Sequence, residues 1–202
     1  MQFDQKGYTV VRSALNKTIS TFVYDYFMMK RMVFSTLLST GYVSKTSQLW
    51  GTFDDAQVPD TYSHYGDICM EMLLTKLQEK MEAETELELV PTYSYARIYK
   101  KGDILKKHKD RPSCAVSCTL NLGGPQTWSI WITDKDGMEN EVILEQGDML
   151  VYKGDKLEHW REPFQGDHCV QVFLHYNDTK SEYKNAYDGR LHLGLPKGIT
   201  NG

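Results

Sequence analysis

The sequence predicts a mainly β protein of the α+β class, in which short strands form a sandwich or barrel and N-terminal helices pack on one sheet. Two observations predict this fold. After about residue 88, seven or eight short runs rich in β-branched, aromatic or alternating residues follow one another at intervals of roughly ten residues, a spacing typical of all-β sandwiches and barrels. Two longer runs with helical periodicity precede them. A long parallel sheet is therefore not expected.

The helices are expected in the first part of the chain, after a short extended piece at residues 8–11. Residues 16–38 and 65–84 carry apolar side chains near helical spacing, and Ser13 or Asn16 can cap the first helix. Residues 44–62, between the helices, are polar and rich in turn residues, which predicts a surface loop. The side chains expected to face the sheet are Ile19, Phe22, Val23, Tyr26, Phe27 and Val33, and then Ile68, Met72, Leu73, Leu77 and Met81.

The strands are expected in the second part of the chain, where turn residues such as Asp136-Gly137 and Gly154-Asp155 separate the apolar runs. Because each run is short and bounded by turns, we assign one strand to each. The expected strands cover residues 90–99, 114–122, 128–133, 141–144, 149–152, 157–161 and about 169–176.

Length and composition fit one domain. A chain of 202 residues with 41% hydrophobic residues can bury a sizeable core. We expect a single domain, residues 1–202, with a helical lead at about 1–87, a strand core at about 88–178 and a loosely packed C-terminal extension at 179–202. Four cysteines are too few for a disulfide scaffold and lack zinc-site spacing, so we expect reduced, mostly buried thiols. They are Cys69, Cys114, Cys118 and Cys169.

Charge and hydropathy favour a cytoplasmic protein. The net charge of −4 gives no general support for binding to nucleic acid or to membranes. The chain starts with no apolar segment of the secretory kind and has no apolar stretch long enough to span a bilayer. We therefore expect neither a nucleic-acid nor a membrane partner.

The most informative residues are His108, Asp110 and His159. In an extended segment, side chains two residues apart point to the same face, so His108 and Asp110 can reach one metal ion. His159, on a neighbouring strand, can supply a third ligand. Two imidazoles and one carboxylate form the facial triad of non-heme Fe(II) oxygenases. The alternatives are a solvated loop histidine at position 108 and a core histidine at position 159, and the surrounding pattern has to decide.

That pattern resembles the Fe(II)/2-oxoglutarate dioxygenases, in particular their prolyl 4-hydroxylase-like branch. The resemblance covers roughly residues 88–178. Residues 97–103 (RIYKKGD) are similar to the strand and turn that lead into the family's His-x-Asp, and residues 145–152 (EQGDMLVY) to the turn and strand before its distal histidine. Pro163, four residues after His159, matches a proline that is common there. The resemblance implies a double-stranded β-helix, or jelly roll, for the strand core.

The resemblance also implies an activity. His108, Asp110 and His159 would hold Fe(II), 2-oxoglutarate would chelate the metal as cosubstrate, and O₂ would take the remaining position. Tyr99 sits where the branch often carries a tyrosine that binds the far carboxylate of 2-oxoglutarate. The products would be succinate, CO₂ and a substrate hydroxylated at an unactivated C–H bond. By analogy the substrate is a prolyl or other amino-acid residue of a peptide, or a small molecule. Because Asp110 is present, hydroxylation is expected rather than halogenation.

One departure from the family concerns the far carboxylate of 2-oxoglutarate. The family normally places a Lys or Arg nine to twelve residues past the distal histidine, but residues 168–171 are His, Cys, Val and Gln. Arg161 is the best replacement, because it shares a strand face with His159 and a guanidinium can bind a carboxylate bidentately. His168 lies at the family's usual offset. Arg97, on the same strand face as the tyrosine named above, is a third candidate.

Two other classes of protein stay open. A cupin-like barrel could use the same ligands as an isomerase or as a binding module without 2-oxoglutarate, and the missing Lys or Arg favours it. A nucleic-acid dealkylating oxygenase normally carries a pair of arginines in its last strand, which residues 169–178 do not supply. His175 and His192 have no partner at useful spacing, so we expect structural or surface roles for them.

Overall fold

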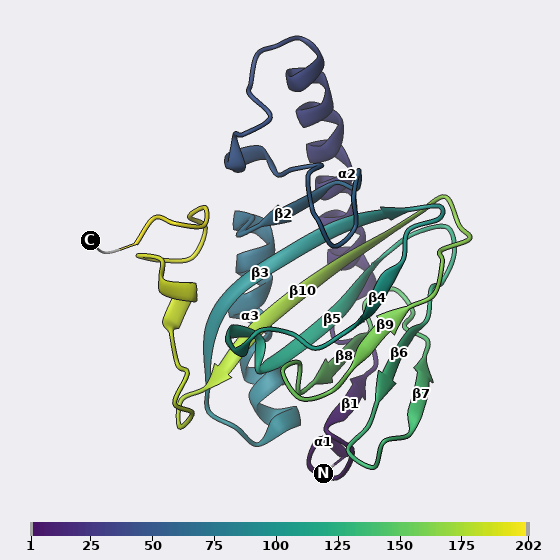
Figure 1. Ribbon diagram of the computed structural model, residues 1–202, viewed down its shortest axis with the longest axis vertical. Coiled ribbons are helices and arrows are strands. Elements are labelled where there is room, and N and C mark those ends of the chain that lie inside the picture. The colour runs from purple at the N-terminus through teal and green to yellow at the C-terminus, as the bar shows by residue number, and fades with distance from the viewer. Residues whose placement is uncertain (1, 201–202) are drawn as a thin grey trace.

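The computed structural model describes residues 2–200, which form ten strands, three α-helices and short 3-10 turns (Figure 1). The predicted mainly β fold is confirmed. The strands are β1 (Tyr8–Val11), β2 (Ser63–Tyr65), β3 (Leu89–Lys100), β4 (Leu105–His108), β5 (Val116–Gly123), β6 (Ile130–Thr133), β7 (Glu139–Val142), β8 (Met149–Tyr152), β9 (His159–Arg161) and β10 (His168–Asp178). The helices are α1 (Gln2–Lys6), α2 (Lys17–Ser39) and α3 (Ile68–Thr85), and the 3-10 turns are η1 (Gln48–Trp50), η2 (Pro112–Cys114) and η3 (Ala186–Gly189).

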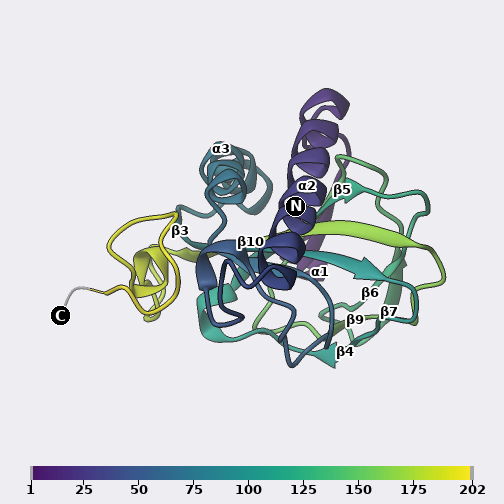
Figure 2. The same ribbon diagram turned by 90° about the horizontal axis from the view of Figure 1, so that it is seen from above.

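Two antiparallel sheets form the jelly roll. The larger sheet has six strands in the order β1-β8-β5-β10-β3-β2, and the smaller has four in the order β4-β9-β6-β7. Seen from above, α2 and α3 lie on one side of the larger sheet and β4, β6, β7 and β9 on the other (Figure 2). The ring of Tyr152, on β8, lies 4.7 Å from that of His159, on β9. The two sheets therefore face each other across this pair.

Both long helices begin at a side-chain cap. Asn16 Oδ1 accepts a hydrogen bond from the Ile19 N–H at 2.9 Å, which identifies Asn16 rather than Ser13 as the cap of α2. Asp67 caps α3 in the same way through the Met70 N–H at 3.1 Å. The helices α2 and α3 match the two predicted ones to within a few residues. The helix α1 was not predicted, because a helix of five residues is too short to show a periodic pattern.

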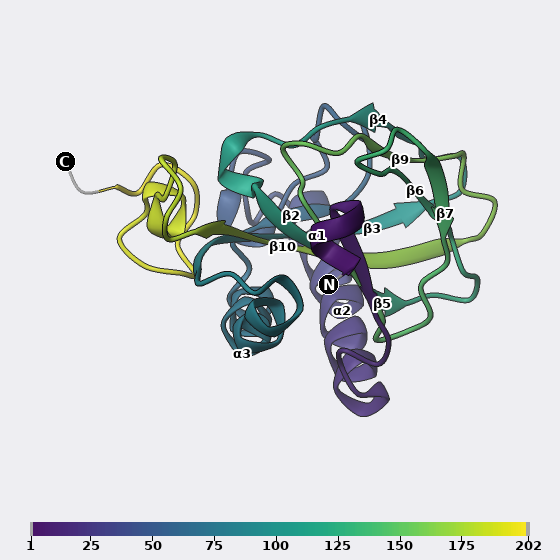
Figure 3. The same ribbon diagram turned by 90° about the horizontal axis from the view of Figure 1, so that it is seen from below.

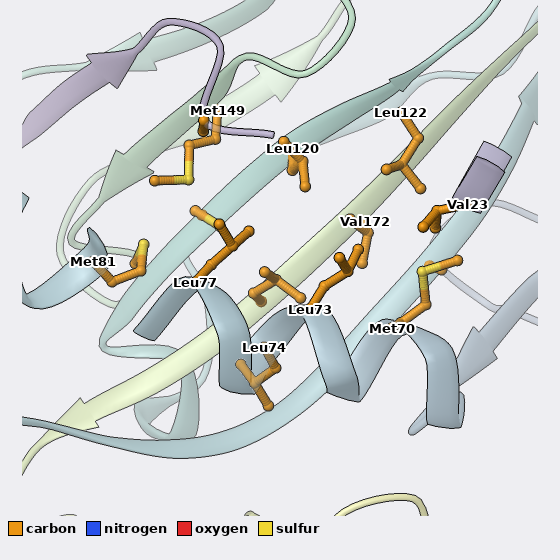
Figure 4. Close-up of a cluster of buried hydrophobic side chains, with 14 of the residues drawn as sticks. Val23, Met70, Leu73, Leu74, Leu77, Met81, Leu120, Leu122, Met149 and Val172 are labelled. Atoms are coloured by element: carbon orange, nitrogen blue, oxygen red, sulfur yellow. The ribbon is translucent and has the colours of Figure 1, made fainter. Parts of the chain in front are cut away.

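The helices bury only part of the predicted stripes: Val23, Phe27, Leu73, Leu77 and Met81 are buried as expected. Ile19, Phe22 and Val33 of α2 and Ile68 and Met72 of α3 are exposed, so their prediction as sheet-facing residues was wrong. On each helix the buried apolar side chains recur at roughly three- to four-residue intervals, which places them on the face that packs on the sheet. They are Val23, Phe27 and Phe34 on α2 and Met70, Leu73, Leu74, Leu77 and Met81 on α3, most of them visible in Figure 4.

The strand β10 runs through the centre of the larger sheet between β3 and β5. Its alternate residues face opposite sides. Val170, Val172 and Leu174 belong to the apolar cluster under the helices, whereas Cys169 and Phe173 belong to a cluster between the sheets. β10 therefore separates a helix-covered core from the space between the sheets.

Residues 179–200 of the predicted extension are mostly exposed or half-buried, and Arg190 anchors them. They lie at the edge of the larger sheet, away from β6 and β7 (Figure 3). Arg190 is 4% exposed and donates to Glu71 Oε1 at 2.7 Å. This buried ion pair fixes the extension to α3.

The remaining comparisons with the prediction concern two short strands, the cysteines and membrane-spanning segments. The strands β2 and β4 were not predicted, because three or four largely polar residues carry no clear alternation. All four cysteines are free, and three are buried, as expected. Within residues 2–200, no helix combines the length and the apolar character needed to cross a membrane.

Candidate metal centre

His108, Asp110 and His159 meet between the two sheets. His108 ends β4 and His159 begins β9, and these two residues are register partners. Their Nε2 atoms lie 3.5 Å and 3.6 Å from Asp110 Oδ1. The ligand atoms of all three residues lie within 4.8 Å of one another. The structure therefore brings the three predicted residues to positions from which one ion could be bound.

Backbone carbonyls fix which nitrogen of each imidazole is free. His108 Nδ1 donates to the Lys106 carbonyl at 2.7 Å, and His159 Nδ1 donates to the Leu157 carbonyl at 3.0 Å. Because a carbonyl only accepts, each Nδ1 carries the proton and each Nε2 keeps its lone pair. Ligating histidines in proteins commonly donate through the other nitrogen in this way. Both rings thus present Nε2 to Asp110 as potential ligands.

The charge of Asp110 is stabilised where it lies. Burial raises the pKa of this carboxyl, but its interactions with the His108 and His159 imidazoles, which are strongest when these rings are protonated, outweigh burial and hold the pKa well below its usual range. Burial lowers the pKa of His108, yet its interaction with Asp110 raises the pKa on balance. The absence of a side chain at Gly154 gives Asp110 room, because a Cβ there would lie 2.5 Å from Asp110 Oδ2. Asp110 is therefore an anion packed into a close-fitting position.

A cavity of about 350 Å³ opens onto these residues. The predicted loop at residues 44–62 contributes Asp55 and Gln57 to the lining. Gln57 Nε2 lies 3.1 Å from His108 Nε2. The remaining lining is mostly aromatic or charged and comprises Tyr93, Tyr95, Arg97, Leu105, Lys109, Arg111, Cys114, Tyr152, Phe173 and His175.

Arg161 is a buried cation without an acidic partner. It is 0% exposed, lies two residues beyond His159 on β9, and is not among the residues that line the cavity. Its guanidinium donates to the Trp128 carbonyl and to Gln171 Oε1, the latter at 3.4 Å, and Arg161 Nε has no hydrogen-bond partner. No carboxylate among residues 2–200 pairs with Arg161 within 4.0 Å. Burial lowers its pKa, as expected for an uncompensated charge.

Arg97 differs from Arg161 because it is already paired. Its guanidinium contacts the Asp55 carboxylate and donates to Gln57 Oε1 at 3.2 Å and to the Tyr99 hydroxyl at 3.0 Å. Tyr99 is fully buried, and its ring lies 4.8 Å from that of Trp128. The Arg161 guanidinium lies 4.9 Å from the same ring. Tyr99 and Arg161 therefore lie against one side chain, whereas the charge of Arg97 is balanced by Asp55.

His168 lies apart from these residues. Its Nε2 is hydrogen-bonded to the Tyr24 hydroxyl of α2, so the ring faces the helix layer rather than the cavity. The structure does not bring His168 together with Tyr99, Arg97 or Arg161.

Solved structures with the same architecture are numerous. A prolyl-4-hydroxylase from Pseudomonas putida matches with a TM-score of 0.63 and 14% identity, over 88% of this chain and 95% of the other. HygX from Streptomyces hygroscopicus, with nickel and 2-oxoglutarate bound, matches with a TM-score of 0.57 and 14% identity, over 88% and 85%. The protein has the fold of the Fe(II)/2-oxoglutarate oxygenases.

This oxygenase fold also occurs in SnoN, a non-heme α-ketoglutarate-dependent epimerase from nogalamycin biosynthesis, with a TM-score of 0.64 and 13% identity, over 96% of this chain and 92% of the other. No family model and no curated protein matches the chain. At these identities the likeness concerns the fold, so the function has to be argued from the residues of the site.

Several residues around the cavity were not predicted from the sequence. His175 was expected to be structural, yet it lines the cavity and its Nδ1 lies 2.8 Å from Ser117 Oγ. Strand alternation could have indicated it, because His175 lies an even number of residues from Gln171 on β10. Asp55 and Gln57 carried no comparable signal, since the path of a loop does not follow from a repeat.

Proposed function

We propose that the protein is an Fe(II)- and 2-oxoglutarate-dependent oxygenase that hydroxylates an unactivated C–H bond and releases succinate and CO₂. The observation that carries this proposal is the convergence of His108, Asp110 and His159 on a cavity within the oxygenase fold. Two imidazole nitrogens and one carboxylate are the donor set that suits Fe(II) with open positions. In this reaction 2-oxoglutarate takes one oxygen atom of O₂ and the substrate takes the other.

The roles of the ligands follow from their hydrogen bonds. His108 and His159 would hold Fe(II) through Nε2, because Nδ1 of each is committed to a backbone carbonyl. Asp110 would supply the one negative charge of the set. When bound, the iron would activate O₂ together with 2-oxoglutarate. The part of the protein is to orient the ligands and to exclude water from the buried side of the site.

Arg161 is proposed to bind the far carboxylate of 2-oxoglutarate. A buried guanidinium without an acidic partner is costly, and an anionic ligand would compensate it. His159 and Arg161 point to the same side of β9, about 6.6 Å apart along the strand. A dicarboxylate held at the metal by one end could therefore direct its other end to Arg161, with Tyr99 as a second contact. Arg97 is less suited, because Asp55 already balances its charge.

The unpaired charge of Arg161 weighs against the cupin-like alternative. A barrel that acts without 2-oxoglutarate has no evident use for an unpaired buried cation two residues past a metal ligand.

For the primary substrate we propose an amino-acid residue of a peptide or another small molecule. A cavity lined by Tyr93, Tyr95 and Phe173 with a few charged groups has the mixed character of small-molecule sites.

The proposal is tested by anaerobic titration of the metal-free protein with Fe(II) and then with 2-oxoglutarate. The ternary complex should show a weak visible charge-transfer band, because the 2-keto acid chelates the iron. The Asp110→Ala variant should show none, since it lacks one of three ligands. If the wild-type protein binds iron but develops no band with 2-oxoglutarate, the cupin-like alternative is favoured instead.

A further inference from the structure

A second group of metal-binding side chains lies beside the proposed iron site. Cys114 ends η2 and His175 lies on β10, and their ligand atoms lie within 4.8 Å of each other and of an Asp110 carboxylate oxygen. Cys114 and His175 are 2% and 5% exposed. All three residues nevertheless line the cavity, so an ion that enters it can reach them. A thiolate, an imidazole and a carboxylate are donors that suit Zn²⁺.

His175 is held in a form that can bind a cation. The Ser117 hydroxyl donates its only proton to the Cys114 carbonyl at 2.9 Å. With that proton on the carbonyl, Ser117 Oγ accepts from His175 Nδ1–H, 2.8 Å away, in the tautomer that leaves Nε2 free. Within residues 2–200, His175 Nε2 makes no hydrogen bond and keeps its lone pair. Burial lowers the pKa of His175 to about 4, so the ring is neutral near neutral pH.

Two neighbouring groups can stabilise a Cys114 thiolate once it is bound to a metal ion. Its Sγ lies 3.0 Å from the Tyr93 hydroxyl, which can donate to a thiolate. The Arg111 guanidinium lies 4.6 Å from the Tyr93 ring and favours negative charge at the sulfur. Burial raises the pKa of the Cys114 thiol to about 12. A divalent cation bound at the sulfur would displace the thiol proton.

The carboxylate of Asp110 faces both groups. Oδ1 lies 3.5 Å and 3.6 Å from the Nε2 atoms of His108 and His159. Oδ2 lies 3.5 Å from Ser117 Oγ, the atom that also contacts His175. One oxygen is thus directed to the histidine pair and the other to the Cys114 side.

We propose that Asp110, Cys114 and His175 form a second metal site, which takes a thiophilic divalent cation such as Zn²⁺ and shares Asp110 with the proposed iron site. Binding forms a metal–thiolate bond and releases the Cys114 proton to solvent, without a change of oxidation state. The site does not depend on oxygenase activity, so it can be tested separately from the proposed function.

The test uses Co²⁺ added to the metal-free, full-length protein without 2-oxoglutarate. A thiolate ligand gives Co²⁺ an intense near-ultraviolet charge-transfer band, which imidazole and carboxylate ligands alone do not give. The wild-type protein should show this band, and Cys114→Ser should lose it. The matched controls Cys118→Ser, buried on the helix side, and Cys69→Ser, the most accessible cysteine, should keep it.

A double variant separates the two sites. In His108→Ala/His159→Ala the cobalt–thiolate band should remain, whereas the iron and 2-oxoglutarate band of the proposed function should disappear. The proposal is overturned if the wild-type protein gives no thiolate band, if Cys114→Ser retains it, or if the double variant loses it.

A second measurement keeps the proposal testable should Cys114→Ser not fold. X-ray absorption of the Zn²⁺-loaded wild-type protein should show one sulfur ligand at about 2.3 Å. A coordination shell made only of nitrogen and oxygen would refute the site.

Discussion

The two faces of the larger sheet differ in chemistry although the same strands build both. Under α2 and α3, β10 contributes Val170, Val172 and Leu174, each 0% exposed in a continuous apolar cluster. Toward the smaller sheet it contributes Gln171 and His175, which are also buried. The helix-covered face therefore supplies most of the hydrophobic stabilisation, whereas the inner face keeps polar groups available for ligands.

The inner face satisfies most of its polar groups through a network. Gln171 Nε2 donates to Asn121 Oδ1 at 3.1 Å, and the Thr119 hydroxyl donates to Gln171 Oε1 at 3.1 Å. Gln171 Oε1 also contacts Arg161. Such a network adds little net stability but fixes side-chain positions. The charge of Arg161 is the part that it leaves uncompensated.

The largest effect is expected from Asp110→Asn, which changes the inner face alone. The amide keeps the shape of the carboxylate but is a much weaker ligand for a divalent cation. We expect 2-oxoglutarate turnover to fall to the level of the metal-free protein. The measurement is succinate formation with added Fe(II), with a circular dichroism spectrum as the control for folding. Turnover at the wild-type rate would remove Asp110 from the ligand set.

Leu174→Ala, on the opposite face of β10, should affect stability and not chemistry. Leu174 is fully buried in the apolar cluster, and replacing such a residue costs about 3 kcal/mol of unfolding free energy. In a protein of this size that corresponds to a fall in Tm of roughly 6–12 °C. Urea unfolding measures the free energy of unfolding, and turnover per folded molecule should stay unchanged. A loss of turnover without a loss of stability would contradict the division between the two faces.

Arg161→Met should weaken 2-oxoglutarate binding while leaving iron binding intact. Loss of the charged contact should cost about 2 kcal/mol, or about 30-fold in affinity. The metal-free variant should itself unfold at a higher temperature than the wild-type protein, because an unpaired buried charge is replaced by an apolar side chain. Titration of Fe(II) and of 2-oxoglutarate separates the two affinities.

The combination of results for Arg161→Met is decisive. Equal loss of iron and 2-oxoglutarate would mean that Arg161 supports the metal ligands rather than the cosubstrate. Arg97→Met is the matched comparison: there we expect a less stable protein, because Asp55 would lose its partner.

Much of the fold could be predicted because strands and turns leave local signals. The strand series after residue 88 has a period of two and Gly-Asp turns, and β3, β5, β8 and β10 lie close to where they were expected. The buried stripe of α2 could not be predicted reliably, because Phe22 and Phe27 are both large and apolar and only packing against the sheet selects between them. Three-residue β2 exists because β3 lies beside it, a long-range cause that local sequence does not contain.

The group of His108, Asp110 and His159 was the easier part of the candidate site to predict. His108-x-Asp110 follows from the geometry of an extended chain, whereas the contacts of Arg161 depend on the pairing of β9 with β4 and β6. Cys114 and His175 are 61 positions apart in the sequence and meet only through the β5–β10 register. Local pattern therefore indicates the ligands, and tertiary pairing determines what surrounds them.

The smallest effect is expected from His168→Ala, which tests the two faces at the start of β10. Sequence offset alone made His168 a candidate for binding 2-oxoglutarate, but its ring is hydrogen-bonded to the Tyr24 hydroxyl on the helix side. We expect unchanged affinity for 2-oxoglutarate and a loss of about 1 kcal/mol of unfolding free energy, the usual contribution of one hydrogen bond. Tyr24→Phe removes the same bond from the other partner and should match His168→Ala in urea unfolding. If His168→Ala weakened 2-oxoglutarate binding while Tyr24→Phe did not, the His168 ring would have to reach the inner face when the cosubstrate binds. The larger sheet would then not keep the residues of its helix-covered face away from the ligand site, as the alternation of side chains along β10 requires.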